Sequence, residues 1–592
     1  MIQQIDYSVI AVPLVLALVA GLVLMLDAFL PSGGRTRTGL GLVSLAGVVV
    51  ALGFVVAQAV RGGGARATFC VPDSLATAAG PGSEPACSFV VDRFTLIFAG
   101  LVLVAGIVVV LMSMTQLAGG GIPAGEWYFL LLCTLVGAVT LPASRDLIML
   151  VVALELVSLP VFALTALKRY DGRSSEAAVK LFLVSVVSTA VMLFGVSLLY
   201  GIAGTVYLSR LASVFSGKTP APGVGAPETY SSLLAAGHGL PGVVTVGLVL
   251  VVAGFAFKIA VVPFHAWAAD VYQGAPIPVA ALLSVISKAA GFAGLILVLV
   301  TALPGQASTW SPIIAVVAAL TMTVGNLLAM RQRSAVRLLA WSSVAQSGYI
   351  LAPLAVTAQT GAMTAAPSLT VGAAGAAGAA GAAGAAGAAG AASATGVVGA
   401  AGAVGAVGAG GTVGAPGVTD AVVGAAGTAG DVAGAVGASM AYLVIYAAMN
   451  LGAFAVVMLM SRTTARNELD DYRGLAFRSP VAAIALAFCL ICLAGLPPGL
   501  AGLFAKVVVF REIIEGGAGW LAVVMAVNTV IGLYYYVVWT ARLFTPAEPV
   551  PAGVRRALPA AWVAVGIAVV VALLFSVAPQ LVLGMTSLSA SG

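Results

Sequence analysis

The chain has 592 residues, of which 61% are hydrophobic and 8% are charged, with a formal net charge of +6 and a mean hydropathy of +1.13. A soluble domain carries roughly 25% charged residues, so this composition excludes a water-soluble globular protein and requires a lipid bilayer as solvent. The basic residues lie mostly in short loops between apolar runs. There they report membrane orientation, and no nucleic-acid partner is predicted.

Apolar runs of 18 or more residues recur along the chain. They predict an all-α polytopic membrane protein with about fourteen transmembrane helices. The first run is longer than the apolar region of a typical signal peptide, so we predict a retained span there. The predicted spans are 8–30, 38–60, 91–113, 125–143, 147–167, 178–201, 241–262, 275–303, 311–330, 335–356, 438–460, 480–514, 519–541 and 558–584.

Two of these spans are predicted to be interrupted. The run 480–514 is too long for one crossing, and it contains Pro497 and Pro498 between two glycines. Prolines and glycines at membrane depth break a helix. The run 241–262 leads into Pro263 and a polar turn that ends at Pro276, so it too is expected to be broken.

The distribution of basic residues predicts the orientation. Alternate connections carry fifteen Lys and Arg residues in one set and seven in the other. The richer set is expected to face the cytoplasm, which places both termini on the outer face of a bacterial plasma membrane. Cys70 and Cys87 then share an outer loop, where they form either a disulfide or two free thiols; the sequence does not decide between these alternatives. Cys489 and Cys492, inside an apolar run, are interpreted as packing residues.

The segment 357–437 departs from this pattern. From Gly372 to Gly390 it repeats Gly-Ala-Ala, and this repeat contains no proline, which argues against a collagen-like structure. Glycine disfavours helix interiors, and alanine barely favours lipid. We predict a flexible outer-loop insert without assigned chemistry.

Charged residues inside spans are costly, by roughly 2.5–3.5 kcal/mol at a helix centre, and they persist where something pairs or hydrates them. Glu155 lies in the middle of its span, and we expect it to pair with a lysine. The predicted partner is Lys258, and this pair would act as the switch of proton transfer. Lys180 lies one turn after Glu176. It is either an interfacial lysine paired with Glu176 or a modulator of Glu155.

Three lysines are predicted near mid-membrane, and helix breaks lie beside two of them. Lys258 precedes Pro263, Lys288 lies a dozen residues into the next span, and Lys506 follows Pro497–Pro498. Burial disfavours the ammonium form, which suits a group that releases and accepts protons. His265, just after Pro263, is either a further proton-transfer group or a polar plug in the broken helix.

Several familiar motifs are absent from the sequence. It has no G-x-G-x-x-G after a strand, no P-loop and no cysteine cluster for iron–sulfur. We therefore predict that the chain binds no nucleotide, no metal and no cofactor of its own.

The sequence resembles subunit N of the proton-pumping NADH-quinone oxidoreductases, the respiratory complex I family. The strongest stretch runs from Gly254 to Pro276 and reads GFAFKIAVVPFHAWAADVYQGAP. The further matching segments are SEAAVK at 175–180, LLAWSSVAQSGY at 338–349, DYRGL at 471–475 and LAGLPP at 493–498. Two positions depart from the family pattern: Ala269 replaces a usual proline, and Gln346 stands where some members have histidine.

The resemblance implies two inverted five-helix repeats with discontinuous helices 7 and 12. It also implies a proton path, formed by Glu155, Lys180, Lys258, Lys288 and Lys506. The expected partners are the antiporter-like subunit M and the small subunits J and K. NADH, FMN, iron–sulfur clusters and quinone are expected in other subunits. The alternative function is a subunit of a multisubunit cation/proton antiporter, which shares this fold.

Overall fold

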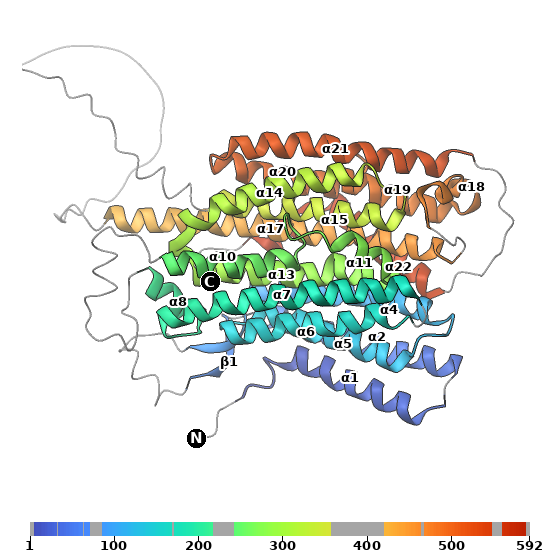
Figure 1. The fold of residues 1–592 in the computed structure, drawn as a ribbon, viewed down its shortest axis with the longest axis horizontal. Coiled ribbons are helices and arrows are strands. Elements are labelled where there is room, and N and C mark those ends of the chain that lie inside the picture. The colour runs from blue at the N-terminus through green and yellow to red at the C-terminus, as the bar shows by residue number, and fades with distance from the viewer. Residues whose placement is uncertain are drawn as a thin grey trace, which may run out of the picture.

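The computed structural model describes residues 5–31, 33–62, 64–71, 86–168, 171–216, 242–356, 419–462, 467–546 and 559–587. Long helices run side by side along the longest axis of the molecule (Figure 1). Among the described residues, eleven helices are long and apolar enough to cross a membrane. This confirms the predicted all-α polytopic fold, while the count of fourteen and the inverted repeats stay predictions.

The helices of the N-terminal half follow the predicted apolar runs, with short connecting elements between them. In chain order the elements are α1 (Ala11–Phe29), α2 (Gly34–Arg61), β1 (Arg66–Cys70), β2 (Cys87–Val91), α4 (Arg93–Leu117), α5 (Ala124–Thr140), η2 (Leu141–Ala143), α6 (Leu147–Ala166), α7 (Gly172–Ala203), α8 (Leu208–Phe215), α10 (Gly242–Lys258) and α11 (Ala268–Gly274).

The remaining elements include two short π-helical stretches, η3 and η4, within one buried span. In chain order they are α12 (Ile277–Leu282), η3 (Leu283–Ser287), α13 (Lys288–Ile296), η4 (Leu297–Ala302), η5 (Pro304–Gln306), α14 (Ala307–Ala329), α15 (Ala335–Leu351), η6 (Ala352–Val356), α17 (Thr419–Met460), η7 (Leu469–Tyr472), α18 (Leu475–Arg478), α19 (Pro480–Ala494), α20 (Leu500–Glu515), α21 (Gly519–Phe544), α22 (Pro559–Val577) and α23 (Pro579–Thr586).

Aspartates fix the starts of three helices. The side chains of Asp92, Asp146 and Asp171 accept hydrogen bonds from the first-turn backbone N–H groups of α4, α6 and α7 at 2.7–3.0 Å. These N–H groups have no partner within the helix, so a capping carboxylate satisfies them. Each helix therefore begins where its sequence supplies a cap.

Both predicted helix interruptions are present. α10 ends at Lys258, and the chain turns through Ala260, at φ +56°, and Pro263 before α11 begins. α19 ends with Gly495 in the left-handed conformation at φ +83°, and α20 begins at Leu500. Positive φ favours glycine at such a helix end, so Gly495 is the residue that permits this sharp stop.

A two-stranded antiparallel hairpin, β1–β2, lies between α2 and α4 and was not predicted from the sequence. Cys70 and Cys87 face each other in its register and form a disulfide. Of the predicted insert 357–437, only the end is described, and there α17 already begins at Thr419. That part is helical, against our expectation of a flexible loop, and 357–418 lie outside the described residues.

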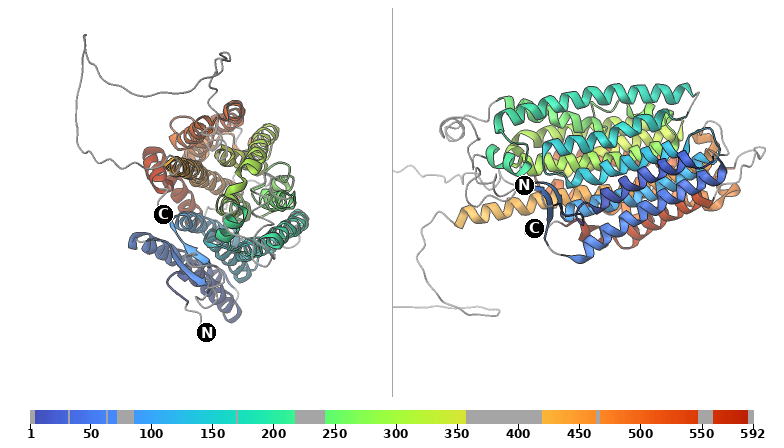
Figure 2. Two further views of the ribbon diagram at one scale, coloured as in Figure 1. Left: turned by 90° about the vertical axis from the view of Figure 1, so that its left-hand side faces the viewer. Right: turned by 90° about the horizontal axis from the view of Figure 1, so that it is seen from below.

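The centre of the bundle is formed by α17 and by the span from α12 to η4. In each, 94% of the most apolar 18-residue window is buried, compared with 22% for α1. Viewed along the helices, α1 and α2 lie at one edge of the bundle (Figure 2). Most side chains of these two spans are therefore buried inside the bundle.

The disulfide yields a test of the hairpin. A chain-entropy argument gives a cross-link of this loop about 3 kcal/mol of stabilisation, so replacing Cys70 and Cys87 together by serine should lower the thermal midpoint of the detergent-solubilised protein. Cys133→Ser, at a free cysteine of α5, is the control and should leave the midpoint unchanged. Full maleimide labelling of Cys70 and Cys87 without reductant would contradict the bond.

Candidate functional site

Three lysines lie buried inside the helix bundle. Lys258, Lys288 and Lys506 are 7%, 1% and 7% exposed. Within the described ranges none of them forms an ion pair. Their ammonium groups are instead held by hydroxyl and carbonyl oxygens, which can stabilise a proton without fixing it permanently on one residue.

Lys258 is the last residue of α10, at the first helix break. Its Nζ donates a hydrogen bond to Ser158 Oγ of α6. Ser158 Oγ in turn donates to the carbonyl of Leu154 at 2.7 Å. The break places the lysine head against α6, because α10 stops before the chain turns at Pro263.

Glu155 lies one helical turn before Ser158 on α6 and is partly buried. Its Oε1 accepts a hydrogen bond from Thr189 Oγ1 of α7 at 2.5 Å. The direct Glu155–Lys258 pair expected from the sequence is not among the ion pairs of the described residues. Instead, each group has a hydrogen-bond partner on a neighbouring helix: the Glu155 carboxylate accepts from Thr189, and the Lys258 ammonium group donates to Ser158.

Lys288 is connected to the first break by a single serine. Its Nζ donates to the Ser343 carbonyl at 2.6 Å and to Ser347 Oγ at 2.8 Å, both on α15. Ser347 Oγ donates to the carbonyl of Ile259, the residue after Lys258, at 2.9 Å. Lys288 follows directly on the π-helical η3, a distortion that is frequent at functional sites.

Hydroxyl and amide groups continue from Lys288 along α15 and α17. Tyr446 donates to Ser343 Oγ at 2.8 Å, and Tyr442 donates to Gln346 Oε1 at 2.7 Å. Tyr442 also stacks on Tyr349, with ring centroids 6.0 Å apart. These tyrosines were not predicted as site residues from the sequence.

Lys506 lies at the far end of this row, beside the second helix break. Its Nζ donates to the carbonyl of Ala494, the last residue of α19, at 2.7 Å, and lies 5.7 Å from the centre of the Tyr349 ring. A Cβ at Gly495 would lie 3.2 Å from this Nζ. The broken helix thus supplies both the acceptor and the space for the lysine.

The structure places Lys180 outside the buried row. Its side chain is 44% exposed and pairs with Glu176 at 2.6 Å, as one sequence alternative predicted, and with Asp270 of α11 at 3.2 Å. Thr189, which holds Glu155, lies nine residues farther along α7, about 13 Å along the axis. Lys180 makes no contact with Glu155 among the described interactions.

Asp270 joins three helices in one ionic cluster. It accepts from Lys180 of α7 and from Arg337 of α15, the latter at 2.8 Å. Partial burial alone would raise the pKa of Asp270, but hydrogen bonds from Arg337 and Lys180 outweigh it and hold the pKa below its ordinary value. The cluster ties α7, which carries Thr189, to α15, which carries Ser343 and Ser347.

His265 lies in the turn after the first break and is partly exposed. Its ring packs 5.6 Å from the Trp341 ring, and its Nδ1 is buried without a hydrogen-bond partner among the described residues. It contacts none of the three buried lysines. The polar-plug interpretation accounts for this position better than direct membership of the row.

The connecting residues were missed because serine and tyrosine are common in membrane helices. A signal did exist in their spacing. Ser343 and Ser347 are four residues apart, as are Tyr442, Tyr446 and Asn450, so each set lies on one helix face. A polar stripe at this spacing in an otherwise apolar span indicates an inward-facing polar surface.

The ionic cluster yields a prediction. Asp270→Asn removes the carboxylate shared by Lys180 and Arg337, and partly exposed pairs contribute about 0.2–1 kcal/mol each, so we expect a loss of about 1 kcal/mol. Because the pKa of Asp270 is depressed, this contribution is present at neutral pH and is lost as pH falls through the folded-state pKa. Thermal midpoints of wild type and variant should therefore differ at neutral pH and converge in acid.

A matched control for this variant is Asp470→Asn. Asp470 is 70% exposed and pairs with Arg542 at 3.3 Å, so its replacement should change the midpoint little. A neutral-pH midpoint for Asp270→Asn equal to that of wild type would contradict a structural contribution of the cluster.

Comparison with known proteins gives consistent matches. The family profile described as "NADH:quinone oxidoreductase/Mrp antiporter, TM" matches residues 144–376 and 423–532. NADH-quinone oxidoreductase subunit N 2 of Streptomyces griseus is 43% identical over 555 residues, covering 93% of this chain and 85% of the relative. Subunit N of Salinispora tropica is 38% identical, covering 93% and 87%.

Solved structures show the same architecture. A chain of respiratory complex I from Thermus thermophilus matches with a TM-score of 0.64 and 25% identity, covering 98% of this chain and all of that one. A chain of the Mrp complex from Dietzia sp. matches with a TM-score of 0.70 and 19% identity, covering 98% and 96%. At that identity the second match concerns the fold alone. The profile-matched regions contain Glu155 and all three buried lysines.

Proposed function

The chain belongs to the subunit N family of NADH-quinone oxidoreductases, and from this premise we propose that Lys258, Lys288 and Lys506 form its proton path. As a member of this family it is a proton-translocating membrane-arm subunit of the enzyme. The observation that carries the proposal is the set of three buried ammonium groups between two helix breaks. Serine hydroxyls hold Lys258 and Lys288, and the ring of Tyr349 lies 5.7 Å from Lys506.

The proposed path begins at Lys258. A carboxylate approaching from Glu155 favours the ammonium form of Lys258, and its withdrawal favours release of the proton. In the present arrangement Glu155 is held by Thr189, and Lys258 by Ser158. We take this as the separated state of the switch, with the direct pair as the other state.

From Lys258 the proton would pass to Lys288 and then to Lys506. Hydroxyl groups both donate and accept hydrogen bonds, so Ser347, Tyr446 and ordered water can relay a proton between ammonium groups. The carbonyls freed at each helix break provide acceptors at both ends of the row. The Asp270 cluster, with Lys180, would act as a positioning element that keeps α7 and α15 in register.

The energy for transport is proposed to come from neighbouring subunits. We infer that NADH, FMN, iron–sulfur clusters and quinone are bound there, since the relatives of this chain are subunits of NADH-quinone oxidoreductases. Subunits M, J and K are the proposed neighbours. We propose the bacterial plasma membrane, with both termini on its outer face, as the location.

The related alternative is a cation/proton antiporter subunit, which the fold match to the Mrp complex brings into consideration. The two functions differ in their partners. Co-purification of NADH dehydrogenase activity with the chain, after mild detergent extraction, supports the proposal. Co-purification with antiporter subunits alone would support the alternative.

The first test replaces Lys258 by methionine in the assembled complex. Methionine keeps the apolar stem and removes the proton-binding group, so we expect proton pumping in proteoliposomes to fall by at least about tenfold. The control is Lys168→Met, because Lys168 is 50% exposed and pairs with Asp171 in a loop. Undiminished pumping by Lys258→Met, in a complex that assembles normally, would refute the path.

The second test removes one connecting hydroxyl. Tyr446→Phe keeps the buried ring but deletes the group that donates to Ser343, so pumping should fall by several-fold while assembly is retained. Tyr534→Phe is the control, since Tyr534 is 60% exposed on α21. Equal pumping by both variants would remove Tyr446 from the path.

A further inference from the structure

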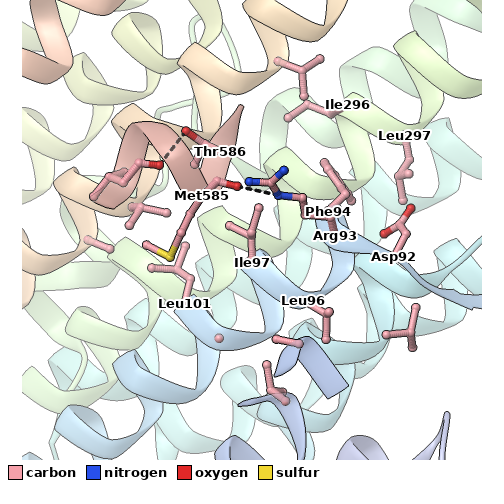
Figure 3. A pocket seen from close by; sticks show the side chains of 18 of the residues that line it. Asp92, Arg93, Phe94, Leu96, Ile97, Leu101, Ile296, Leu297, Met585 and Thr586 are labelled. Carbon is pink, nitrogen blue, oxygen red and sulfur yellow. Dashed lines mark hydrogen bonds between the residues drawn. The ribbon is translucent and has the colours of Figure 1, made fainter. Parts of the chain in front are cut away.

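A large groove lies between the N-terminal helices and α17. Its volume is about 1640 Å³, and its walls are formed mainly by α2, α4, the segment 296–310, α17 and α22. Apolar side chains line it, among them Leu101 and Ile97 of α4, with Met585 of α23 beside them (Figure 3). Pockets that hold drug-sized ligands measure roughly 300–1,000 Å³, so this groove suits a larger apolar molecule.

The mouth of the groove carries charge. Arg66, Arg93 and Arg145 line it together with a single carboxylate, Asp92. Asp92 pairs with Arg145 at 2.5 Å, which leaves two positive charges uncompensated by this carboxylate. Arg93 Nε donates to the carbonyl of Met585 at 3.1 Å (Figure 3), an acceptor that satisfies hydrogen bonding without cancelling the charge.

The groove opens toward the lipid. Val56 and Val60 of α2 and Leu574 of α22, all on its lining, are 53%, 80% and 48% exposed. Gly100 of α4 also lines it, and a Cβ there would meet no atom within 4 Å. A molecule moving in the bilayer could therefore enter from the side, with its polar end at the arginines.

We propose that this groove binds one anionic phospholipid of the leaflet on the hairpin side. Its acyl chains lie along α4 and α17, and its phosphate group lies at Arg66 and Arg93. Apolar walls on several helices with a cationic end match the two parts of such a lipid, and basic pockets between transmembrane helices are a recurring form of headgroup recognition. A neutral lipid would leave the positive mouth unmatched.

The groove lies directly behind the polar row. On α17, Val444, Ala448 and Leu451 line the groove, while Tyr442 and Tyr446 point to the α15 side. At 100° per residue these two sets occupy opposite faces of the helix. A bound lipid would thus fill the space behind the helix that positions the tyrosines, and its removal would loosen that helix.

The test measures lipid binding and is independent of pumping. The complex is purified, stripped with detergent and re-equilibrated with phosphatidylglycerol or phosphatidylcholine, and the retained lipid is quantified by mass spectrometry. Gly100→Leu adds a side chain inside the groove, where a Cβ meets no other atom, and should reduce retained phosphatidylglycerol by at least about tenfold. The control is Gly53→Leu, on α2 outside the groove and equally without neighbours within 4 Å.

The headgroup is tested separately. The backbone of Arg66 is paired in the β1–β2 hairpin, but its side chain forms no ion pair among the described residues and only interacts electrostatically with the exposed Asp6, so Arg66→Gln should leave the fold intact. It should reduce phosphatidylglycerol retention about fivefold, the effect expected of one basic residue near a lipid surface, while phosphatidylcholine is unaffected. Equal retention of the two lipids by wild type, unchanged retention by Gly100→Leu, or density for a neighbouring subunit's helix in the groove would each overturn the proposal.

Discussion

The arrangement of this protein depends on the cost of keeping an ammonium group inside a membrane-spanning bundle. Lys258, Lys288 and Lys506 are buried and form no ion pair among the described residues, although Glu155 interacts electrostatically with Lys258, so each requires oxygen acceptors nearby. Helix breaks provide carbonyls for this purpose. The carbonyl of Ala494 accepts directly from Lys506, and the carbonyl of Ile259 accepts from Ser347, whose hydroxyl accepts from Lys288. An intact helix would have used these carbonyls in its own hydrogen bonds. The helix breaks therefore provide hydrogen-bond acceptors that the buried lysines need.

Between the breaks, α15 and α17 provide the connection. α15 offers Ser343, Gln346, Ser347 and Tyr349, while α17 offers Tyr442 and Tyr446. These helices cross a deeply buried part of the molecule, where an unmatched polar group costs much free energy. Nearly every hydroxyl in the row has a partner, which keeps the side chains in defined positions. A proton relay requires this order, because transfer depends on short donor–acceptor distances.

The periphery serves different purposes. At one face, Asp270 joins α7 to α15 and limits their relative movement next to the first break. At the edge of the bundle, α1, α2 and the disulfide-linked hairpin border an apolar groove with arginines at its mouth. The groove reaches the rear of α17, so the central helix is held by polar contacts on one side and faces a lipid-accessible space on the other. Both features act on the positions of the helices that carry the row.

The sequence by itself determined the membrane fold, the approximate positions of the long helices, both helix breaks and the lysines that lie inside the bundle. These follow from hydropathy, from Pro263 and Pro497–Pro498, and from the rarity of charge in apolar runs, all of which are local properties. Only the tertiary structure decided the partners. In the structure Glu155 accepts a hydrogen bond from Thr189 and Lys258 donates one to Ser158, whereas the sequence suggested a direct ion pair between Glu155 and Lys258. Lys180 pairs with Asp270, which lies ninety residues farther along the chain. The structure also revealed the tyrosines of α17 and the β1–β2 hairpin. Such pairings depend on which helix faces meet, and hydrophobic periodicity in nearly uniformly apolar spans carries too little information to specify that.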